Sequence, residues 1–480
     1  MGEFSYDKLH EECGVFGIYN QGDIEDIIQA PYYGLYALQH RGQESCGIAV
    51  NDDGVISVHK NVGLVNEVFT KEVLETMTRG KMTVGHCRYA TTGTRNESNS
   101  QPIVLRHVKG NLAIAHNGNL TNAAALRSDI ELTGGLFHSS SDTEVIAYEI
   151  IKERLTAPSI EEAVVNAMKT IKGAYSLVIM SPQKLIAARD PYGFRPLCMG
   201  KLGKSVIFAS ESCALDSIGA TFVRDIEPGE VVTVTEEGIK SDKTHCGQTS
   251  AFCVFEYIYF ARPDSVINGS SVHIARQRAG ALLALNHPVQ ADVVIGVPDS
   301  GIDAALGYSR QSGIPYGIGF LKNKYIGRTF IAPTQKQREN DVRIKLNPIA
   351  ATVKDKRVIL IDDSIVRGTT CLKIIKLLKE AGAKEIHFRL SSPPFKYPCY
   401  FGTDISSSEN LIAYKNSIEE IRAMLDIDSL GFLSVEDLPK LADNTKCKMC
   451  DGCFTGVYPL EVPKCAQKSR FETKISENND

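Results

Sequence analysis

The first half of the chain alternates between short apolar runs and polar turn clusters, a pattern that predicts many short β-strands. Apolar runs of strand length occupy residues 47–50, 112–115, 175–180, 206–209 and 231–234. Longer stretches with helical spacing intervene at 142–153 and 159–170. The second of these places four aliphatic side chains on one face: Ile160, Ala163, Val164 and Ala167. We therefore expect two packed sheets with helices outside them.

The second half has a different pattern, in which near-continuous apolar runs lead into small polar residues and then into helices. Residues 291–298 form one such run, and residues 357–361 form another. Strands that are apolar on both faces are typical of a parallel sheet covered by helices. The helix after the second run is predicted to bury Ile374, Leu377, Leu378 and Ala381. A further strand is predicted at 385–388, so this half is expected to be an α/β domain.

Composition adds limits to this picture. The chain has 480 residues, enough for two domains, and its net charge of −4 gives no reason to expect nucleic acid or a membrane as a partner. The first residues lack the basic and apolar regions of a signal peptide, and no apolar run approaches the length of a membrane span. We expect a soluble, cytoplasmic protein, in which 13 cysteines indicate metal binding or thiol chemistry rather than disulfides.

Cys13 opens the first apolar run, directly after two acidic residues, and allows two interpretations. It could be a core cysteine at the head of a buried strand. Alternatively, residues 1–12 could be a propeptide, and a cut between Glu12 and Cys13 would make Cys13 the N-terminal residue. Its free α-amine would then be the general base for a thiol nucleophile, whereas in the uncut chain that nitrogen is an amide and cannot accept a proton.

Four polar clusters in the first half favour the nucleophile. They lie at residues 39–45, 86–93, 116–120 and 140–144. Each has a plain explanation alone, since Asn-Gly is common in turns and Ser-Asp before an apolar run is a common helix cap. Together with Cys13 they supply what an amide hydrolase needs. Arg88 and Asp142 could hold the carboxylate and ammonium of an amino acid. Asn117 and the N–H of Gly118 could stabilise an oxyanion.

These clusters resemble the class II glutamine amidotransferase domains, a family of N-terminal-nucleophile hydrolases. The shared motifs, in the family's order, are Cys-Gly-Val-Phe-Gly, His-Arg-Gly-Gln, Arg-Tyr-Ala-Thr-Thr-Gly, His-Asn-Gly-Asn and Ser-Asp-Thr-Glu. The resemblance implies an αββα sandwich over residues 13–245. It also implies that this domain hydrolyses glutamine with Cys13 and passes ammonia to the synthase domain that follows.

A second chemical motif follows the apolar run at 357–361. Asp362 and Asp363 are adjacent carboxylates that could reach ribose hydroxyls or Mg²⁺. The small residues at 368–370 would let backbone N–H groups surround a phosphate at a helix N-terminus. The loop contains no Gly-Lys-Ser/Thr, so it is not a Walker loop. The plain alternative is an ordinary turn with two surface acids.

This motif resembles the loop of type I phosphoribosyltransferases that binds phosphoribosylpyrophosphate (PRPP). The resemblance implies PRPP binding by Asp362, Asp363, Ser364, Arg367, Gly368, Thr369 and Thr370. It implies a Mg²⁺ ion near Ser300 and the two aspartates. Residues 322–331 resemble the family's flexible loop, in which Lys324 and Arg328 would meet pyrophosphate on closing, although a solvated basic loop is the plain alternative.

The order of all these motifs resembles the glutamine–PRPP amidotransferases, the family that opens purine synthesis, from Cys13 to about Tyr458. The resemblance implies a pentosyltransferase that converts glutamine, PRPP and water to 5-phosphoribosylamine, glutamate and pyrophosphate. It implies a type I phosphoribosyltransferase domain at 253–435 and a C-terminal segment at 436–480. A homotetramer with feedback inhibition by purine nucleotides is also implied.

The C-terminal segment holds two overlapping C-x-x-C pairs, Cys447, Cys450 and Cys453, which could bind zinc, form a redox dithiol or hold an iron–sulfur cluster. One branch of the family has both a propeptide and a [4Fe–4S] cluster. The matching ligands are Cys253, Cys399, Cys450 and Cys453. The cluster would be structural or an oxygen-sensitive degradation switch. Cys246 competes with Cys253, and Cys447 leaves open which tail pair binds.

Two rival functions stay open at this point. Another synthase could follow the same amidotransferase domain, but glucosamine-phosphate and asparagine synthesis need an isomerase or an ATP pyrophosphatase domain instead of the loop at 362–370. A PRPP-sensing regulatory protein with a degenerate transferase site is the other rival. Such proteins lack an intact amidase and usually carry a DNA-binding domain, so the sequence favours the enzyme.

Overall fold

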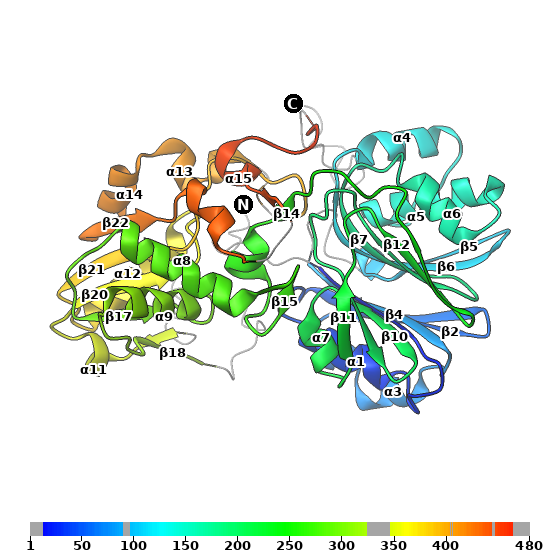
Figure 1. Ribbon diagram of the computed structural model, residues 1–480, viewed down its shortest axis with the longest axis horizontal. Helices are drawn as coiled ribbons and strands as arrows, with labels where there is room; N and C mark the ends of the chain where they lie inside the picture. The colour runs from blue at the N-terminus through cyan, green and yellow to red at the C-terminus, as the bar shows by residue number, and fades with distance from the viewer. Residues whose placement is uncertain are drawn as a thin grey trace, which may run out of the picture.

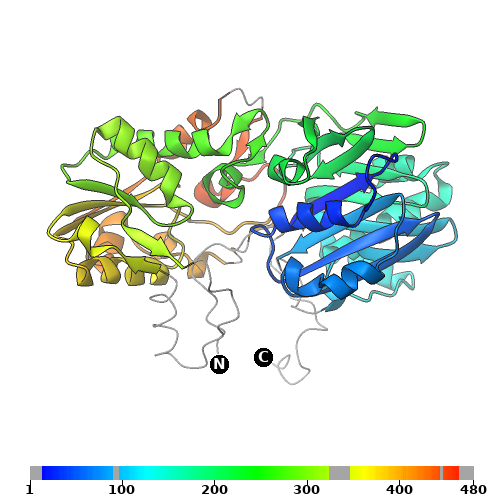
Figure 2. The ribbon, with the colours of Figure 1, turned by 90° about the horizontal axis from the view of Figure 1, so that it is seen from below.

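The computed structural model has two halves, one built on two antiparallel sheets and one on a parallel sheet (Figure 1). It describes residues 13–89, 97–323, 346–403, 405, 407–443 and 447–463. Figure 2 shows the halves side by side, with the C-terminal part of the described chain between them. Across these described residues, no helix combines the length and the apolar character needed to cross a membrane.

The first half is a sandwich of two antiparallel sheets. The seven-stranded sheet runs β11 (Thr221–Asp225), β9 (Cys198–Leu202), β10 (Ser205–Ala209), β1 (Gly14–Tyr19), β4 (Met82–Arg88), β2 (Ser45–Asp52) and β3 (Val55–Val62). The six-stranded sheet runs β13 (Gly238–Asp242), β12 (Val231–Thr235), β8 (Leu185–Arg189), β7 (Gly173–Met180), β6 (Gly110–Leu120) and β5 (Ile103–His107). Strands β1 and β4 pack against β6 and β7 of the other sheet.

Three apolar layers hold this sandwich together. Val15, Val84 and Val178 belong to the buried core between the two sheets. The short helices α1 (Gln29–Ala37) and α7 (Ser212–Asp216) cover the outer face of the seven-stranded sheet. Helices α5 (Asp142–Thr156) and α6 (Ile160–Ala167) cover the other sheet. The predicted αββα arrangement is confirmed.

Two element boundaries differ from the pattern-based prediction. The helix predicted at 159–170 ends at Ala167, because the N–H groups of Lys169 and Thr170 turn back onto Asn166 and Ala167. The polar cluster at 116–120 was expected to follow a strand, yet it is part of β6, because it pairs with β7 as far as Gly173. Cross-strand pairing outweighed the turn preference of Asn-Gly there.

The second half has a four-stranded parallel sheet in the order β17 (Val293–Gly296), β20 (Arg357–Asp362), β21 (Glu385–Leu390) and β22 (Ser429–Phe432). Helices α8 (Val272–Asn286) and α9 (Gly301–Ser312) pack on one face. Helices α12 (Thr369–Glu380) and α14 (Ile418–Leu425) pack on the other. Side chains of β20 alternate between the two layers, which explains why the strand is apolar throughout.

A junction joins the two halves. Strand β14 (Phe252–Cys253) pairs in parallel with β23 (Met449–Cys450) near the C-terminal end of the described chain. A single helical turn follows at Glu256–Phe260, and its Phe260 belongs to the same apolar core as Phe454 of α15 (Gly452–Thr455). Buried Arg276 of α8 donates to the carbonyls of Tyr257, Tyr259 and Ala261, so the open end of that turn is capped from the transferase side.

Glycines let α8 and α9 cross closely. A Cβ at Gly280 would lie 1.8 Å from the carbonyl oxygen of Ala304, and a Cβ at Gly307 would lie 1.8 Å from that of Gln277. Both neighbours are backbone atoms, which cannot swing aside. The crossing sets the position of α9, whose first turn follows Ser300.

We predict that Gly280→Ala destabilises the second half by about 1–3 kcal/mol, because the methyl group overpacks the helix crossing. Leu285→Ala on the same helix is the matched control, since Leu285 is 60% exposed and its truncation should change stability by less than about 0.5 kcal/mol. Denaturant unfolding monitored by circular dichroism measures both. Equal unfolding midpoints for the two variants would show that the helices can move apart without loss of stability.

Candidate functional site

Cys13 lies immediately before β1 and is buried. It is 6% exposed, and its Sγ donates to the carbonyl of Tyr89 across 3.4 Å. The strand that it leads into pairs with β4 on one side and β10 on the other, so its backbone position is fixed from both sides. The predicted propeptide, residues 1–12, lies outside the described residues.

Asn117 and Gly118 lie in β6, on the sheet that packs against β1. The Asn117 side chain is fully buried, and neither its Oδ1 nor its Nδ2 has a hydrogen-bond partner among the described residues. Leaving a buried amide without hydrogen-bond partners costs about 1–3 kcal/mol of folding stability. A ligand bound here would supply the missing hydrogen bonds. Gly118 has φ of +143°, and a Cβ there would lie 2.1 Å from the carbonyl oxygen of Ala174, so only glycine fits.

Asp142 begins α5 and reaches the end of β6. Its Oδ2 accepts the N–H of Leu120 at 2.9 Å, and its Oδ1 lies 3.6 Å from Nδ1 of His116. Burial alone would raise the pKa of Asp142, but His116 and the backbone N–H groups outweigh it and hold the pKa below its ordinary value. Asp142 is therefore an anion. The helix cap predicted before it is present, because Ser141 Oγ accepts the N–H of Thr143.

Four buried charges connect Cys13 to the junction. Arg41 donates through Nε to the carbonyl of Cys13 at 3.1 Å. Its two terminal nitrogens bind Glu256 of the junction turn at 2.9 and 2.7 Å, and one of them also binds Glu211 at 2.6 Å. Burial would raise the pKa of Glu211, but His40 and Arg41 hold it well below its ordinary value. Arg195 approaches the same carboxylate of Glu256 at 3.5 Å.

The segment 399–403 of the second half lies against the amidotransferase sheet. Arg195 donates to the carbonyl of Phe401 through Nε at 3.2 Å and through Nη2 at 2.8 Å. Asn119 Nδ2 donates to the carbonyl of Tyr400 at 3.0 Å. Gly402 lies so close to Gly118 that a Cβ at Gly402 would be 3.4 Å from the Gly118 carbonyl carbon. This segment therefore touches the strand of the candidate oxyanion site.

The second candidate site lies at the carboxyl end of β20. Asp362 and Asp363 are both buried, and Asp363 accepts hydrogen bonds from Ser300 Oγ at 2.5 Å and Ser364 Oγ at 2.6 Å. Ser300 precedes α9, so the loops after two neighbouring parallel strands meet here, at the edge where ligands bind in such sheets. The residues that the sequence predicts as Mg²⁺ ligands, Ser300 and the two aspartates, therefore lie together.

Residues 364–370 lead from β20 into the N-terminus of α12. Gly368 has φ of +90° and precedes the first helical residue, Thr369. Thr370 and Arg367 lie in the same turn, with Arg367 exposed. Backbone N–H groups at such a helix start suit a phosphate. Lys324 and Arg328, predicted to close over this site, lie outside the described residues.

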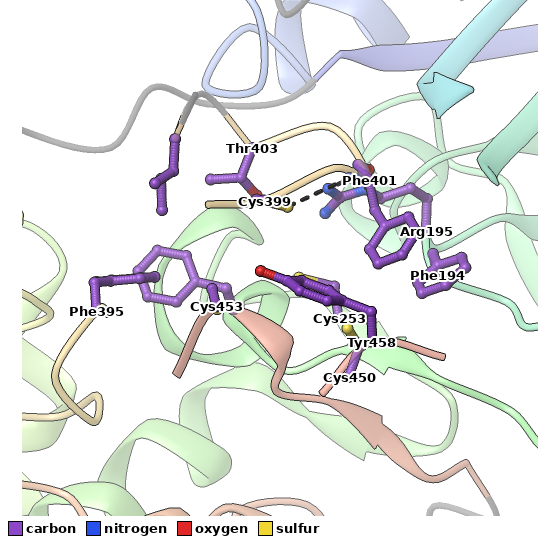
Figure 3. A pocket seen from close by; sticks show the side chains of 12 residues that line it. Phe194, Arg195, Cys253, Phe395, Cys399, Phe401, Thr403, Cys450, Cys453 and Tyr458 are labelled. Atoms are coloured by element: carbon purple, nitrogen blue, oxygen red, sulfur yellow. Dashed lines mark hydrogen bonds between the residues drawn. The ribbon is translucent and has the colours of Figure 1, made fainter. Parts of the chain in front are cut away.

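The four predicted cluster cysteines line one cavity. Cys253, Cys399, Cys450 and Cys453 face it together with aromatic side chains, and Arg195 reaches its rim (Figure 3). Cys253 and Cys450 are directly paired residues of β14 and β23. Cys447 and Cys246 are not among the lining residues. Burial raises the pKa of Cys450 to about 12, so this thiol must lose a proton before it binds a metal.

The four thiols of the cavity are of the donor type that both zinc and iron–sulfur clusters take. Within the described ranges, no three His, Cys, Asp or Glu side chains come together closely enough to hold one metal ion. A four-iron cluster is held by four cysteine thiolates, and a structural zinc site can also take four of them, at about 2.3 Å from the metal.

The sequence pattern gave no role to four buried charges, Arg41, Arg195, Glu211 and Glu256. The one signal was the place of Arg41 in the polar cluster at 39–45. Which charges pair could not be read from the sequence. Arg41 and Glu256 are 215 positions apart.

Comparison with known proteins agrees with a glutamine amidotransferase domain followed by a phosphoribosyltransferase domain. A family model described as a glutamine amidotransferase domain matches residues 86–217, and one described as a phosphoribosyl transferase domain matches residues 273–391. The amidophosphoribosyltransferase of Bacillus subtilis (strain 168) is 48% identical over 459 residues, which is 95% of each chain. That of Methanocaldococcus jannaschii is 47% identical over 94% of this chain and 98% of its own. The solved structure of the glutamine PRPP amidotransferase of B. subtilis with ADP and GMP superposes with a TM-score of 0.87 at 46% identity, covering 95% of this chain and 99% of that one.

His86 of β4 is predicted to make the folding stability depend on pH. Its Nε2 lies 2.9 Å from the carbonyl oxygen of His116 in the opposite sheet, and burial lowers its pKa to about 3. The pKa of a histidine in an unfolded chain is about 6.5. Below that pH the unfolded chain therefore binds a proton that the folded chain does not. We predict that this residue makes stability fall with decreasing pH by up to about 1.4 kcal/mol per unit.

The measurement compares wild type with His86→Gln by denaturant unfolding between pH 7 and pH 5. Asp190 opposes the effect, because burial raises its pKa to about 6, so only the difference between the two proteins isolates His86. His138→Gln is the control, since the His138 side chain is 84% exposed. If the stability of wild type and His86→Gln changes equally with pH, His86 is not the source.

Proposed function

The chain belongs to the amidophosphoribosyltransferase family, and from that premise we propose how its two sites divide the reaction. The enzyme acts in purine biosynthesis and converts glutamine, PRPP and water to 5-phosphoribosylamine, glutamate and pyrophosphate. The proposal assigns glutamine hydrolysis to the first half and transfer to PRPP to the second. The observation that carries it is the buried amide of Asn117, which has no hydrogen-bond partner within the described part of the chain and lies on a strand that packs against β1.

In the first site, the Cys13 thiol attacks the glutamine amide carbon. Once the chain is cut after Glu12, the α-amine of Cys13 takes the thiol proton and later gives it to the leaving ammonia. The side-chain amide of Asn117 and the N–H of Gly118 hold the oxyanion, which would give the Asn117 side chain a hydrogen-bond partner. Water then releases glutamate from the thioester. Arg88 and Asp142, both buried charges at this end of the sandwich, hold the substrate's carboxylate and ammonium.

In the second site, PRPP places its 5-phosphate in the turn at 364–370 and its ribose hydroxyls at Asp362 and Asp363. The α12 N-terminus and the small residues there favour a phosphate, and the buried carboxylates favour hydroxyl groups. Ammonia displaces pyrophosphate at C1. A closed path between the sites keeps ammonia unprotonated, since ammonium has no lone pair for attack. Lys324 and Arg328 remain the predicted lid residues.

Ser300, Asp362 and Asp363 form an oxygen donor set that fits a Mg²⁺ ion, because Mg²⁺ takes one or two carboxylates and completes its shell with substrate phosphates and water. Bound there, Mg²⁺ would neutralise pyrophosphate charge as it leaves. The four cavity cysteines fit a [4Fe–4S] cluster, which would lock the junction of β14, β23 and the 399–403 segment.

We further propose purine nucleotides as feedback inhibitors and a homotetramer as the assembly. One solved relative was crystallised with ADP and GMP, and another is described as an allosteric regulatory enzyme of purine biosynthesis, with a TM-score of 0.88. A cytoplasmic location remains the prediction made from sequence. No observation favours the alternative of a PRPP-sensing regulatory protein.

Cys13→Ala should lower glutamine-dependent synthesis by at least about 10³-fold, because the nucleophile is gone. Synthesis from free ammonia should change by less than about threefold, since the PRPP site is intact. A chain with the leader uncut should behave like Cys13→Ala. Full glutamine-dependent activity in a protein whose intact mass includes residues 1–12 would contradict the N-terminal nucleophile.

Cys450→Ser and Cys453→Ser should each reduce iron and acid-labile sulfide in anaerobically purified protein, because each removes a thiol from the cavity. Cys447→Ser is the matched control, since Cys447 lies in the same tail outside the cavity lining. It should keep the iron and sulfide of the wild type. A colourless wild-type protein that contains zinc would contradict the cluster.

A further inference from the structure

The segment 399–403 holds a candidate cluster ligand at one end and contacts the amidotransferase site at the other. The N–H of Phe401 lies 3.5 Å from Cys399 Sγ. The carbonyl of Phe401 accepts hydrogen bonds from Nε and Nη2 of Arg195. Arg195 in turn approaches Glu256, whose carboxylate binds Arg41. A continuous chain of buried polar contacts therefore runs from the cysteine cavity to the backbone of the nucleophile.

We propose that Glu256 and Arg195 are positioning residues for glutamine hydrolysis, which fix the backbone of Cys13 by means of Arg41. Arg41 donates to the Cys13 carbonyl through Nε, and its terminal nitrogens bind the carboxylates of Glu211 and Glu256. Glu256 therefore helps to set where the guanidinium sits, and the guanidinium sets where the carbonyl sits. The four charged residues of this relay, Arg41, Arg195, Glu211 and Glu256, are 0–1% exposed, so water does not substitute for a lost partner.

A second branch runs from the same segment to the oxyanion strand. Asn119 binds the carbonyl of Tyr400, and Gly402 lies against Gly118. The segment thus holds the nucleophile through one branch and the oxyanion strand through the other. Cys13 and Gly118 come from different sheets, so a common support from outside the sandwich would keep their spacing constant. Assembly of the cysteine cavity becomes a condition for glutamine hydrolysis, although no group in the cavity takes part in it.

This inference rests on the proposed role of Cys13, and Glu256→Gln is its first test. The amide keeps the side-chain shape and removes the charge that holds both arginines. Glutamine-dependent kcat/KM should fall by about 100-fold, because small displacements of reacting groups have effects of that size. Synthesis from ammonia should stay within about threefold of wild type, since the PRPP site is not displaced.

Two measurements besides turnover separate positioning from general damage. A glutamine analogue with a chloromethyl ketone in place of the amide reports the Cys13 capture rate by intact mass, and this rate should fall in parallel. Iron and sulfide per chain should stay at the wild-type level. Glu230→Gln is the matched control, because Glu230 is also a buried carboxylate bound by an arginine, Arg224, but contacts no member of the relay.

Asn119→Ala tests the second branch and keeps the proposal testable if Glu256→Gln does not fold. Asn119 is only partly buried, so its truncation should be tolerated, and glutamine-dependent activity should fall by about tenfold for one lost hydrogen bond. The inference would be overturned if both variants kept wild-type glutamine-dependent and ammonia-dependent activities. It would also be overturned if the two activities fell by the same factor. A Cys13→Ala protein that still used glutamine would instead overturn the proposed function.

Discussion

A balanced set of buried charges at the junction is the constraint on which the rest of the structure depends. Arg41, Arg195 and Glu211 come from the amidotransferase half, Arg195 from the loop between β8 and β9, and Glu256 comes from the turn that follows this half. Leaving one partner of such a pair unpaired typically costs about 3–5 kcal/mol. Any other arrangement of the two halves would leave these charges unpaired. The stability lost would exceed what a typical surface contact contributes.

The apolar regions of the molecule were largely predictable from sequence. Residues on one face of α6 are buried as the spacing indicated, and Ile374, Leu377 and Leu378 of α12 are buried against the parallel sheet, while Ala381 is only half-buried just after that helix. Periodicity works there because burial depends on which face a residue occupies, and the face follows from position along the element. The boundaries were less predictable, because β6 continues through a turn-like sequence that a neighbouring strand holds extended.

The two sites differ in how much the sequence could show. Asp362, Asp363 and the turn into α12 are contiguous, so their local order already describes most of that site. The pairing of Ser300 with Asp363 spans 63 positions and depends on the sheet bringing two loops together. The charge relay and the cysteine cavity depend on even longer connections. No local preference encodes such a contact.

The pairing of β14 with β23 has a consequence for how the protein is made. Ser250 and Lys448, at the edge of this pairing, are 198 positions apart and are joined by a hydrogen bond. A nascent chain can complete the sandwich of the first half long before the partner strand has left the ribosome. The strand at Phe252–Cys253 must remain unpaired through that interval, with its edge and one thiol accessible. Synthesis thus leaves the junction as the last part of the molecule to close, and a truncated message yields a finished amidotransferase half without the partner strand for its junction.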